Sequence, residues 1–341
     1  MDLNDELRAL ADAVAGAPGA VVGVGSRTQF DVGDPVPTGA VPIAAPSGIV
    51  QFEPADLTVT VGAGTTCSEL DRVLGEAGQE IALDPRDPDA TVGGVLAVGT
   101  SGHRRLRDGP IRDAVLEVRF ATGDGRLVKG GGPTVKNVSG YDLPRLIVGS
   151  FGTLGILGQV TLRARARPAL ARWGARPGPA DEVLAALVQP SSVLWDGHTT
   201  TVLVEGHPDD VDRELLAGAL TPVAGPPGLP EGRHRGRISV RPRAIAELGA
   251  GLDASGCRWL AEAGVGTVHV AADTGAALGA ARTAAHASGG WLLREAGASD
   301  LDGFGIALPN LGVMGRLKAA FDPDGKLAPG RLPLAPTAVS A

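Results

Sequence analysis

The stretch Asp89-Ala90-Thr91-Val92-Gly93-Gly94-Val95-Leu96-Ala97-Val98-Gly99-Thr100-Ser101-Gly102 decides the fold of this chain. Its glycines allow backbone N–H groups to approach an anion closely and to form a concave nest. Thr91, Thr100 and Ser101 add hydroxyl donors. The stretch contains no lysine, which distinguishes it from a Walker phosphate loop. The pattern indicates a phosphate-binding loop, although tight turns in a glycine-rich protein would produce it equally well.

A second, shorter glycine loop lies upstream. Val21-Val22-Gly23-Val24-Gly25-Ser26 reads as a buried strand that runs into a glycine turn. Two such turns at strand ends could hold a pyrophosphate from two sides. The spacing Gly23-x-Gly25 lacks the third glycine of a dinucleotide-binding fingerprint, so the loop is not of that type.

Strand and helix signals surround the two loops. Leu57–Val61 alternates with a period of two and predicts a half-buried strand. Thr66-Cys67-Ser68-Glu69 is a capping box, which predicts the start of a helix. The remaining patterns predict a glycine-dense loop region over residues 84–113, a hairpin over 116–128 and a strand over 159–162.

The pattern of predicted elements changes after residue 168. Arg163–Pro168 is basic and ends in proline, which makes it a plausible domain boundary. Predicted strands and helices then alternate, as in a small α/β sandwich. The strands cover residues 200–204, 238–240, 268–270 and 291–293, and the helices cover 209–220, 276–287 and 313–321.

Composition excludes several functions. The chain has 341 residues, 43% of them hydrophobic, which is enough for two packed domains. Its net charge of −7 argues against nucleic-acid binding, because a binder of the phosphate backbone needs a basic surface. Cys67 and Cys257 lie far apart, so we expect no metal site, disulfide framework or iron–sulfur cluster in this chain. We expect a cytoplasmic protein, because the sequence shows neither a signal peptide nor a membrane-spanning segment.

The order and spacing of these motifs resemble the FAD-binding domain shared by vanillyl-alcohol oxidase, D-lactate dehydrogenase and glycolate oxidase. The resemblance covers roughly the first half of the chain. Besides the two glycine loops and the strand Leu57–Val61, it rests on Gly62-Ala63-Gly64, Gly140-Tyr141-Asp142-Leu143 and Gly149-Ser150-Phe151-Gly152-Thr153-Leu154-Gly155-Ile156.

The fold that this resemblance implies is α+β: a two-lobed FAD-binding domain of the vanillyl-alcohol-oxidase type with a small α/β cap domain. The expected division is an FAD-binding domain over residues 1–167 and a cap over 168–303. A C-terminal segment over 304–335 is expected to return to the FAD-binding domain.

Within this superfamily, the sequence is similar to the E subunits of glycolate oxidase. Ser101-Gly102-His103-Arg104-Arg105, Lys136-Asn137-Val138-Ser139-Gly140-Tyr141-Asp142-Leu143 and the tail over 317–330 carry the similarity. Phe151 stands where many catalytic relatives carry Glu, and Ala328 replaces the Asn that is usual before Pro-Gly. The cap contains no counterpart of the substrate-binding Arg and His motifs of the catalytic relatives.

The resemblance implies non-covalent FAD, held by two phosphate loops and by residues beside the flavin. The two loops would present Gly93 and Gly94, through their N–H groups, and Gly23 with its neighbours to the pyrophosphate. The expected cofactor-binding residues are Gly23, Gly25, Ser26, Thr91, Gly93, Gly94, Thr100, Ser101, Gly102, Gly155 and Ile156. Gly155 and Ile156 would touch the cofactor through their main chain, unless they form an ordinary β-turn.

Several polar residues leave alternatives open. A covalent flavin link through His103 is conceivable, but a solvent-facing His103 is favoured. His269 alternates with two valines and is expected to face solvent. Lys136 would either stabilise reduced flavin or clamp its loop. A basic cluster comprises Arg104, Arg105, Arg107 and Arg112. It would bind either the diphosphate or an anionic substrate. Alternatively, it would be a solvated loop paired with Asp108 and Asp113.

The function that follows is flavin chemistry on a small 2-hydroxy acid such as glycolate, which would be oxidised to glyoxylate. Such a reaction needs a base and an anion clamp, and the sequence identifies neither. We therefore expect this chain to work beside a sister FAD-linked subunit and an iron–sulfur subunit, to reach a membrane only through partners, and to oxidise little glycolate alone. The alternatives are a self-sufficient FAD-dependent dehydrogenase of a hydroxy acid, sugar acid or lactone, and a flavin-free structural subunit.

Overall fold

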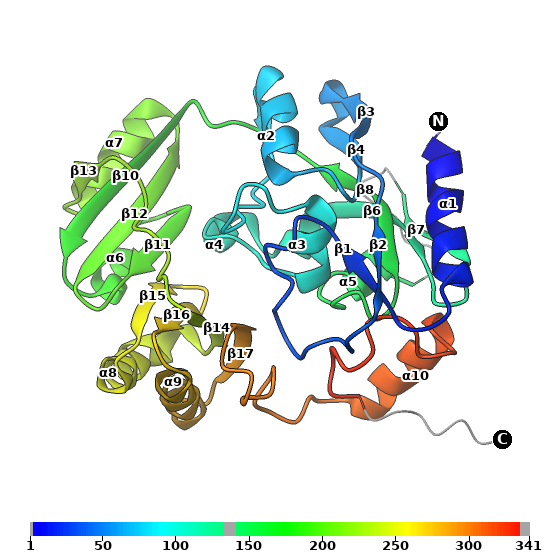
Figure 1. The fold of residues 1–341 in the computed structure, drawn as a ribbon. Coiled ribbons are helices and arrows are strands. Elements are labelled where there is room, and N and C mark those ends of the chain that lie inside the picture. Colours follow the sequence, from blue (N-terminus) through cyan, green and yellow to red (C-terminus); the bar gives the residue numbers. More distant parts are fainter. Residues whose placement is uncertain (1–2, 133–140, 335–341) are drawn as a thin grey trace.

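The computed structural model describes residues 3–132 and 141–334 and contains two main sheets (Figure 1). The first is formed by the N-terminal half of the chain and the second by residues that follow it. The elements of the N-terminal half are α1 (Leu3–Gly16), β1 (Val21–Val24), β2 (Val41–Ala44), β3 (Ile49–Glu53), the 3-10 turn η1 (Pro54–Asp56), β4 (Thr58–Gly62), α2 (Cys67–Glu76), β5 (Gln79–Glu80), α3 (Val92–Val98), α4 (Arg105–Asp108), η2 (Ile111–Ala114), β6 (Val115–Ala121), β7 (Leu127–Gly131), α5 (Leu143–Ile147), β8 (Ile156–Arg163) and β9 (Arg165–Ala166).

The first sheet is antiparallel and has the order β3-β4-β8-β6-β7. Apolar residues of α2, α3 and α5 pack with Val118, Phe120 and Val160 in one buried core. On the other face, α1 approaches β8 closely at Gly158, where a Cβ atom would lie 2.8 Å from the Cδ2 atom of Leu10. Both faces of the central strands are therefore covered, which explains why the hydroxyls of Thr60 and Thr161 are buried and lie 2.9 Å apart.

A separate parallel pair, β1 with β2, lies beside α1 (Figure 1). Val21 and Ile43 of this pair pack with Leu10, Val14 and other residues in a second core. The end of β1 leads directly into the shorter glycine loop. The pair therefore fixes where this loop emerges from the packed interior.

The second sheet has eight antiparallel strands in the order β13-β10-β12-β11-β15-β16-β14-β17. This part of the chain is the cap-like half of the molecule. Its elements are β10 (Leu170–Pro177), α6 (Ala180–Ala186), β11 (Ser192–Trp195), β12 (Thr199–Gly206), α7 (Pro208–Ala217), β13 (Thr221–Val223), β14 (His234–Ser239), the 3-10 turn η3 (Pro242–Ala244), α8 (Ile245–Ser255), β15 (Arg258–Glu262), β16 (Thr267–Ala272), α9 (Gly275–Ala287) and β17 (Trp291–Ala296).

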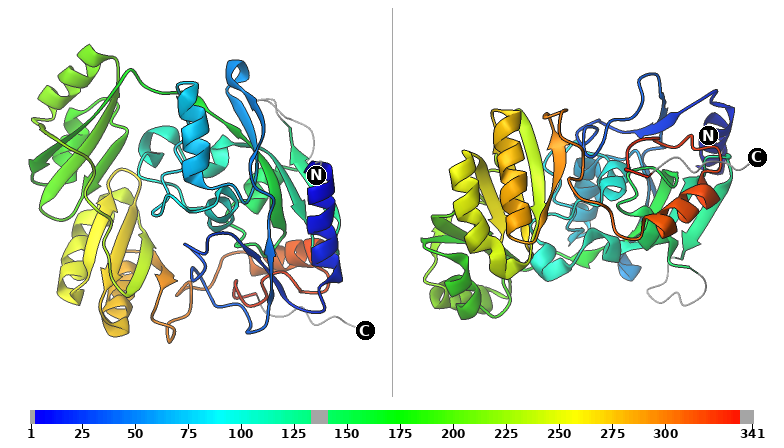
Figure 2. Two further views of the ribbon diagram at one scale, coloured as in Figure 1. Left: turned by 45° about the horizontal axis from the view of Figure 1, so that its top comes forward. Right: turned by 90° about the horizontal axis from the view of Figure 1, so that it is seen from below.

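Helices α8 and α9 cover one face of this sheet, on the side away from the N-terminal half (Figure 2). Ile238, Val268 and Leu292 point into that helix-covered core. Because side chains alternate along a strand, Arg237 and His269 project from the opposite face. Leu293 also projects there and packs with Val32 of the N-terminal half. One face of the cap sheet is therefore turned toward the N-terminal half.

The chain returns to the N-terminal half at its C-terminal end, through α10 (Leu311–Phe321) (Figure 1). Leu317 and Phe321 pack against the first core, and the rings of Phe321 and Phe120 lie 5.8 Å apart. Lys318 Nζ donates to the backbone oxygens of Thr153 and Leu327. The helix and the tail after it are thus part of the N-terminal half in space.

Several sequence predictions differ from the structure. The glycine stretch was expected as a loop, but Val92–Val98 is a helix: Thr91 caps its N-terminus by accepting a hydrogen bond from the Gly94 N–H, and apolar Val92, Val95 and Leu96 face the core. The strand near Leu57 is buried on both faces rather than one. Strands β10, β11 and β15 and helices α6 and α8 were not anticipated. Within the described residues, no helix has the length and apolarity needed to cross a bilayer.

Candidate functional site

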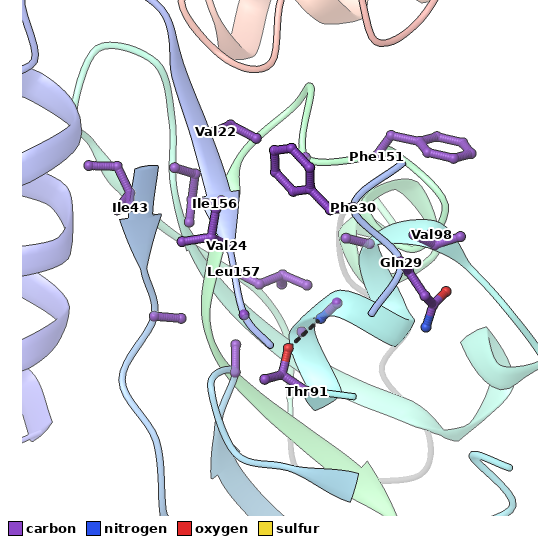
Figure 3. Close-up of a pocket in the computed structure, with 18 of the residues that line it drawn as sticks. Val22, Val24, Gln29, Phe30, Ile43, Thr91, Val98, Phe151, Ile156 and Leu157 are labelled. Carbon is purple, nitrogen blue, oxygen red and sulfur yellow. Dashed lines mark hydrogen bonds between the residues drawn. The ribbon is translucent and has the colours of Figure 1, made fainter. Parts of the chain in front are cut away.

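A cavity lies where β1, α3 and β8 meet (Figure 3). One side is apolar and carries Val24, Ile156 and Leu157, while Thr91 stands opposite at the start of α3. The loop after β1 passes along the cavity with Gln29 and Phe30.

The structure brings most of the predicted cofactor-binding residues to this cavity. They come from three separate segments: the loop after β1, the N-terminal end of α3 and the start of β8. Those that line it are Gly23, Gly25, Ser26, Thr91, Gly93, Gly94, Gly155 and Ile156. Thr100, Ser101 and Gly102 line a second, adjoining cavity instead.

The glycines serve mainly by lacking a side chain. A Cβ atom on Gly25 would lie 2.7 Å from the Thr91 Cγ2 atom, so the two loops could not meet. A Cβ atom on Gly93 would lie 2.8 Å from the Ala63 backbone oxygen. The Gly93 N–H already donates to that oxygen at 2.7 Å, and the Gly94 N–H donates to Thr91 Oγ1 at 3.2 Å. The expected donation of these two N–H groups to a pyrophosphate is therefore not the arrangement in this structure.

The charges around the cavity suit an anionic ligand. Arg27 and Arg331 line it, and no carboxylate is among the described residues that do so. The buried Ser150 Oγ and Arg331 Nε atoms have no hydrogen-bond partner within the part of the chain that the structure describes. Burial lowers the pKa of Arg331. A dinucleotide with a diphosphate group fits these surroundings, because it brings negative charge and acceptor oxygens to a wall that holds arginines, hydroxyls and apolar side chains.

Two residues at the cavity adopt a backbone conformation that is unusual outside glycine. Arg27 has a φ angle of +62° and Phe151 one of +56°. Such conformations cost about 1–3 kcal/mol and cluster at binding sites. Arg27 and Arg331 both lie over the ring of Phe30, at 4.9 and 5.2 Å from its centroid. Arg331 Nη1 also donates to the backbone oxygens of Phe30 and Val32, so these contacts hold the loop in place.

The second cavity, here called the cleft cavity, lies between the N-terminal half and the cap sheet. It shares Thr28, Gln29 and Val32 with the first cavity, so the two adjoin. Thr100 Oγ1 donates to Gln29 Oε1 at 3.0 Å, and Ser101 Oγ accepts from the Ile111 N–H at 3.1 Å. The three residues predicted to run beside the flavin therefore line the cleft cavity, and Thr100 contacts Gln29, which lines both cavities.

The cap contributes charged residues to the cleft cavity from neighbouring strands. Glu262 of β15 and His269 of β16 are buried, and Glu262 Oε1 lies 2.8 Å from His269 Nε2. Arg237 of β14, which pairs in register with His269, lies 3.6 Å from Glu295 of β17. Arg235 lines the same cavity. The expectation that His269 faces solvent is thus wrong, because the N-terminal half covers the sheet face from which it projects.

The predicted basic cluster divides between several roles. Arg104 donates to both carboxylate oxygens of Asp84 and lies 3.1 Å from Glu80. Burial tends to raise the pKa of Asp84, but the hydrogen bonds and charge of Arg104 outweigh it and hold that pKa below its ordinary value. Arg107 donates to the Glu205 backbone oxygen and to Ser191 Oγ of the cap. Arg105 and Arg112 are exposed.

Arg165 forms ion pairs that link the N-terminal half to the cap. Its guanidinium lies 2.7 Å from Glu80, 2.9 Å from Asp108 and 3.1 Å from Glu205 of β12. Asp108 was expected to pair with the basic cluster, but it pairs with Arg165. The network explains how the cleft keeps its shape between two separate cores.

Two further predictions concern residues near the cleft and a loop beyond it. His103 is partly buried rather than solvent-facing: its ring lies 5.3 Å from that of Trp173, and its Nε2 atom lies 3.9 Å from Asp84. Lys136, Asn137, Val138, Ser139 and Gly140 lie outside the described residues. Tyr141, the first residue of that motif that the structure describes, is 93% exposed.

Comparison with known proteins finds similarity in the N-terminal part of the chain. Residues 3–131 match the family model of an FAD binding domain. Glycolate oxidase subunit GlcE of Escherichia coli (strain K12) is 33% identical over 215 residues, which cover 57% of this chain and 59% of that subunit. D-lactate dehydrogenase of Archaeoglobus fulgidus is 41% identical over 110 residues, which cover 32% of this chain and 25% of that enzyme. The matched regions thus span less than two thirds of these relatives.

A solved structure shows the same fold over almost the whole chain. The structure of alkyldihydroxyacetonephosphate synthase superposes with a TM-score of 0.69 and 15% sequence identity, covering 95% of this chain and 74% of that one. The arrangement of helices and two main sheets is therefore a known architecture, and the α+β fold class is confirmed.

Proposed function

We propose, from the premise that residues 3–131 form an FAD binding domain, that this chain is the FAD-binding subunit of a glycolate-oxidase-type complex. The reaction would convert a small 2-hydroxy acid such as glycolate to its 2-oxo acid. FAD, when bound, supplies the acceptor for the hydride that leaves the α-carbon. The sequence similarity to glycolate oxidase subunit GlcE supports the choice of complex.

The observation that carries the proposal is the character of the first cavity. It combines two arginines, several glycines at close contacts and an apolar wall, and it opens into the cleft beneath the cap. We assign non-covalent FAD binding to Gly23, Gly25, Ser26, Thr91, Gly93, Gly94, Thr100, Ser101, Gly102, Gly155 and Ile156. In this assignment Arg27 and Arg331 neutralise the diphosphate, and Gly93 and Gly94 leave room for it.

The orientation of the cofactor follows from where the two cavities join. The adenine and diphosphate part would occupy the first cavity, and the flavin ring would reach Thr100, Ser101 and Gly102 at the edge of the cleft. The cap sheet would then exclude water from the reactive face. This arrangement favours the division into an FAD-binding domain over 1–167, a cap over 168–303 and a returning segment over 304–335.

The partners proposed are a sister FAD-linked subunit and an iron–sulfur subunit. The support is the similarity to a protein that is itself one subunit of glycolate oxidase. Such a complex would act in the cytoplasm, and any contact with the inner membrane would come through its partners.

A second candidate function is a self-sufficient FAD-dependent dehydrogenase. The paired Glu262 and His269 in the cleft cavity favour it, because they place a proton acceptor beside the proposed flavin position. The two candidates differ in whether the chain alone sustains turnover.

Two measurements on purified protein test the proposal. Acid precipitation should release FAD into the supernatant; flavin that stays on the denatured polypeptide would contradict non-covalent binding. Dye reduction with glycolate and D-lactate should be strong for the co-expressed complex and weak for the lone subunit. Robust steady turnover by the lone subunit would instead identify a complete dehydrogenase, and a colourless protein that takes up no FAD would contradict both candidates.

A further inference from the structure

We propose that Arg294 of β17 is a positioning residue for the cofactor: from the cap, it holds the segment over residues 29–33 against the first cavity, so that FAD binding and the packing of β17 on the N-terminal half stabilise each other. The inference rests on the proposed function only in taking FAD as the ligand of the first cavity. It goes further by giving a role in cofactor binding to a residue of the cap that does not itself line that cavity.

The segment over residues 29–33 needs support from other parts of the chain. It belongs to no helix or strand, yet it contributes Gln29, Phe30 and Val32 to the wall of the first cavity. Within its own turn, the Phe30 N–H donates to the Arg27 oxygen at 3.2 Å and the Val32 N–H to the Gln29 oxygen at 3.4 Å. Both distances exceed the optimum of about 2.9–3.0 Å, so these bonds alone fix the segment weakly.

Arg294 contacts the end of this segment through both its side chain and its backbone. Its Nη2 atom donates to the Gly33 backbone oxygen at 2.6 Å, and its own backbone oxygen accepts from the Gly33 N–H at 3.0 Å. Its Nη1 atom donates to the Gly297 oxygen at 3.0 Å, which fixes the guanidinium. Arg294 is buried, and a hydrogen bond from a charged donor is stronger than one between neutral groups. The segment is therefore tied firmly to the cap.

The returning C-terminal part closes the same junction. The Gly303 oxygen accepts from the Arg294 N–H at 2.8 Å, and the Gly303 N–H donates to Asp34 Oδ1 at 2.6 Å. A Cβ atom on Gly303 would lie 2.5 Å from the carbonyl carbon of Gly33, so the two backbones are in direct contact. The N-terminal half, the cap and the returning segment thus meet at one point, and any displacement of β17 would displace Gly33.

Apolar packing follows the same path. Val32 and Leu293 are buried and pack with Phe304. The ring of Phe304 lies 5.6 Å from that of Phe151, which lines the first cavity, and 6.4 Å from that of Trp291 on β17. A packed cluster therefore joins β17 to the cavity wall beside the hydrogen bonds of Arg294.

The charges at the junction explain why the cofactor would strengthen it. Arg331 lines the first cavity, and the buried Nε atoms of Arg331 and Arg294 have no hydrogen-bond partner among the described residues. Burial lowers the pKa of Arg331; the charge of Asp31 opposes this effect, and the charge of Arg294 adds to it. The two guanidinium groups therefore repel each other. A diphosphate beside Arg331 would offset that repulsion and strengthen the contact of Arg294 with Gly33.

Thermodynamic linkage makes this coupling reciprocal. If FAD binding strengthens the packing of β17, that packing must strengthen FAD binding by the same factor. Coupling between two sites commonly amounts to about 5–150-fold in affinity, so loss of Arg294 is expected to weaken FAD binding by about tenfold.

Hydrogen exchange of the purified chain, with and without FAD, tests the coupling without turnover. In the parent, FAD should slow exchange in peptides that cover residues 25–34 and 291–305, the second by about tenfold. Exchange in α8, on the face of the cap sheet away from the N-terminal half, should not change. Protection confined to the N-terminal half, or equal protection of α8, overturns the inference.

Arg294→Met removes the donors and keeps an unbranched apolar side chain. We expect its FAD affinity to fall by about tenfold and, at saturating FAD, the protection of residues 291–305 to be lost while residues 25–34 stay protected. Arg294→Lys keeps a charged donor and should bind FAD more tightly than Arg294→Met. Equal FAD affinity in these two variants contradicts the role of the donated hydrogen bond.

Arg107→Met is the control. Arg107 also donates to a backbone oxygen across the interface with the cap, that of Glu205 at 2.7 Å, but it does not line the first cavity. This variant should keep the FAD affinity of the parent and the FAD-dependent protection of residues 291–305. An equal loss in Arg107→Met and Arg294→Met would mean that any loosening of the cap has the same effect, and the assignment to Arg294 would fall.

A second variant keeps the test decisive if Arg294→Met does not fold. Asp34→Ala removes the bond to Gly303 with Arg294 in place, and it should reduce the protection of residues 291–305 by a smaller factor; unchanged protection overturns the inference. A parent chain that takes up no FAD contradicts the proposed function itself. A parent chain that binds FAD but shows no protection of residues 291–305 contradicts only the coupling.

Discussion

The two adjoining cavities are built in different ways. The first is shaped mostly by backbone and small residues, and each of its glycines lies within a short local motif. The cleft cavity is instead lined by charged side chains from four strands of the cap and from loops of the N-terminal half. The comparison teaches that a cavity formed mostly by backbone and glycine turns leaves a recognisable pattern in the sequence, whereas a cavity formed by the register of paired strands does not.

The largest effect is expected from a charge placed in the first cavity. Gly94→Asp would put a carboxylate into a cavity that has none among its described lining residues, where it would repel the diphosphate. We expect the purified variant to lose nearly all its FAD, measured as the ratio of flavin to protein. Gly16→Asp adds the same side chain at the exposed end of α1, where nothing lies within 4 Å, and should keep FAD in full. Equal FAD content in both variants would contradict the assignment of this cavity.

The second largest effect is expected on the stability of the ion-paired region beside the cleft. Arg165→Met would leave Glu80, Asp108 and Glu205 without their shared partner. Because the Arg165 side chain is 30% exposed, we expect a loss near the lower end of the range for buried pairs, about 3 kcal/mol of unfolding free energy. Urea unfolding measures it. Arg72→Met, which removes an exposed pair with Glu76, should change stability by no more than about 1 kcal/mol.

The effect of FAD on thermal stability tests the comparison of the two cavities. A ligand that binds only the folded state stabilises it by about 2.7 kcal/mol when present at 100 times its Kd. We expect thermal unfolding of the chain to shift upward with added FAD and to return to its starting value once the flavin is removed. Glycolate added without FAD should give a smaller shift. A larger thermal shift with glycolate alone than with FAD would mean that the cleft cavity binds its ligand independently of the cofactor.

The smallest effect concerns Asp84, which lines the cleft cavity. Its pKa is lower in the folded state than in the unfolded chain, so the stability that it contributes is present at neutral pH and is lost as pH falls through the folded-state pKa. Asp84→Asn should therefore be less stable at pH 7, and its stability should fall less steeply in acid. Parallel curves of stability against pH for the parent and the variant would contradict this contribution.

The sequence was sufficient for the first cavity because glycine loops encode their geometry locally. Gly25 and Gly93 are recognisable from their neighbours along the chain, and the resemblance that implies the fold class rests on the order of such motifs. The helical form of Val92–Val98 was missed because seven apolar and glycine residues show no helical periodicity that distinguishes a helix from a loop.

The cleft could not be derived in the same way. Glu262 and His269 meet only through the antiparallel pairing of β15 with β16. Arg235 and Glu295 both line the cleft cavity, beside an irregularity between Arg235 and Gly236 in the pairing of β14 with β17. The sequence offers no signal of that register. The alternation around His269 correctly indicated the face from which it projects, but not that another part of the molecule covers that face.

The structure of the chain with FAD bound tests the central claim most directly. The account predicts the diphosphate between the Gly25–Ser26 turn and the N-terminal end of α3, near Arg27 and Arg331, with the flavin ring at Thr100, Ser101 and Gly102 and one face open to His269. FAD located elsewhere, or a flavin ring turned away from the cleft cavity, would contradict it.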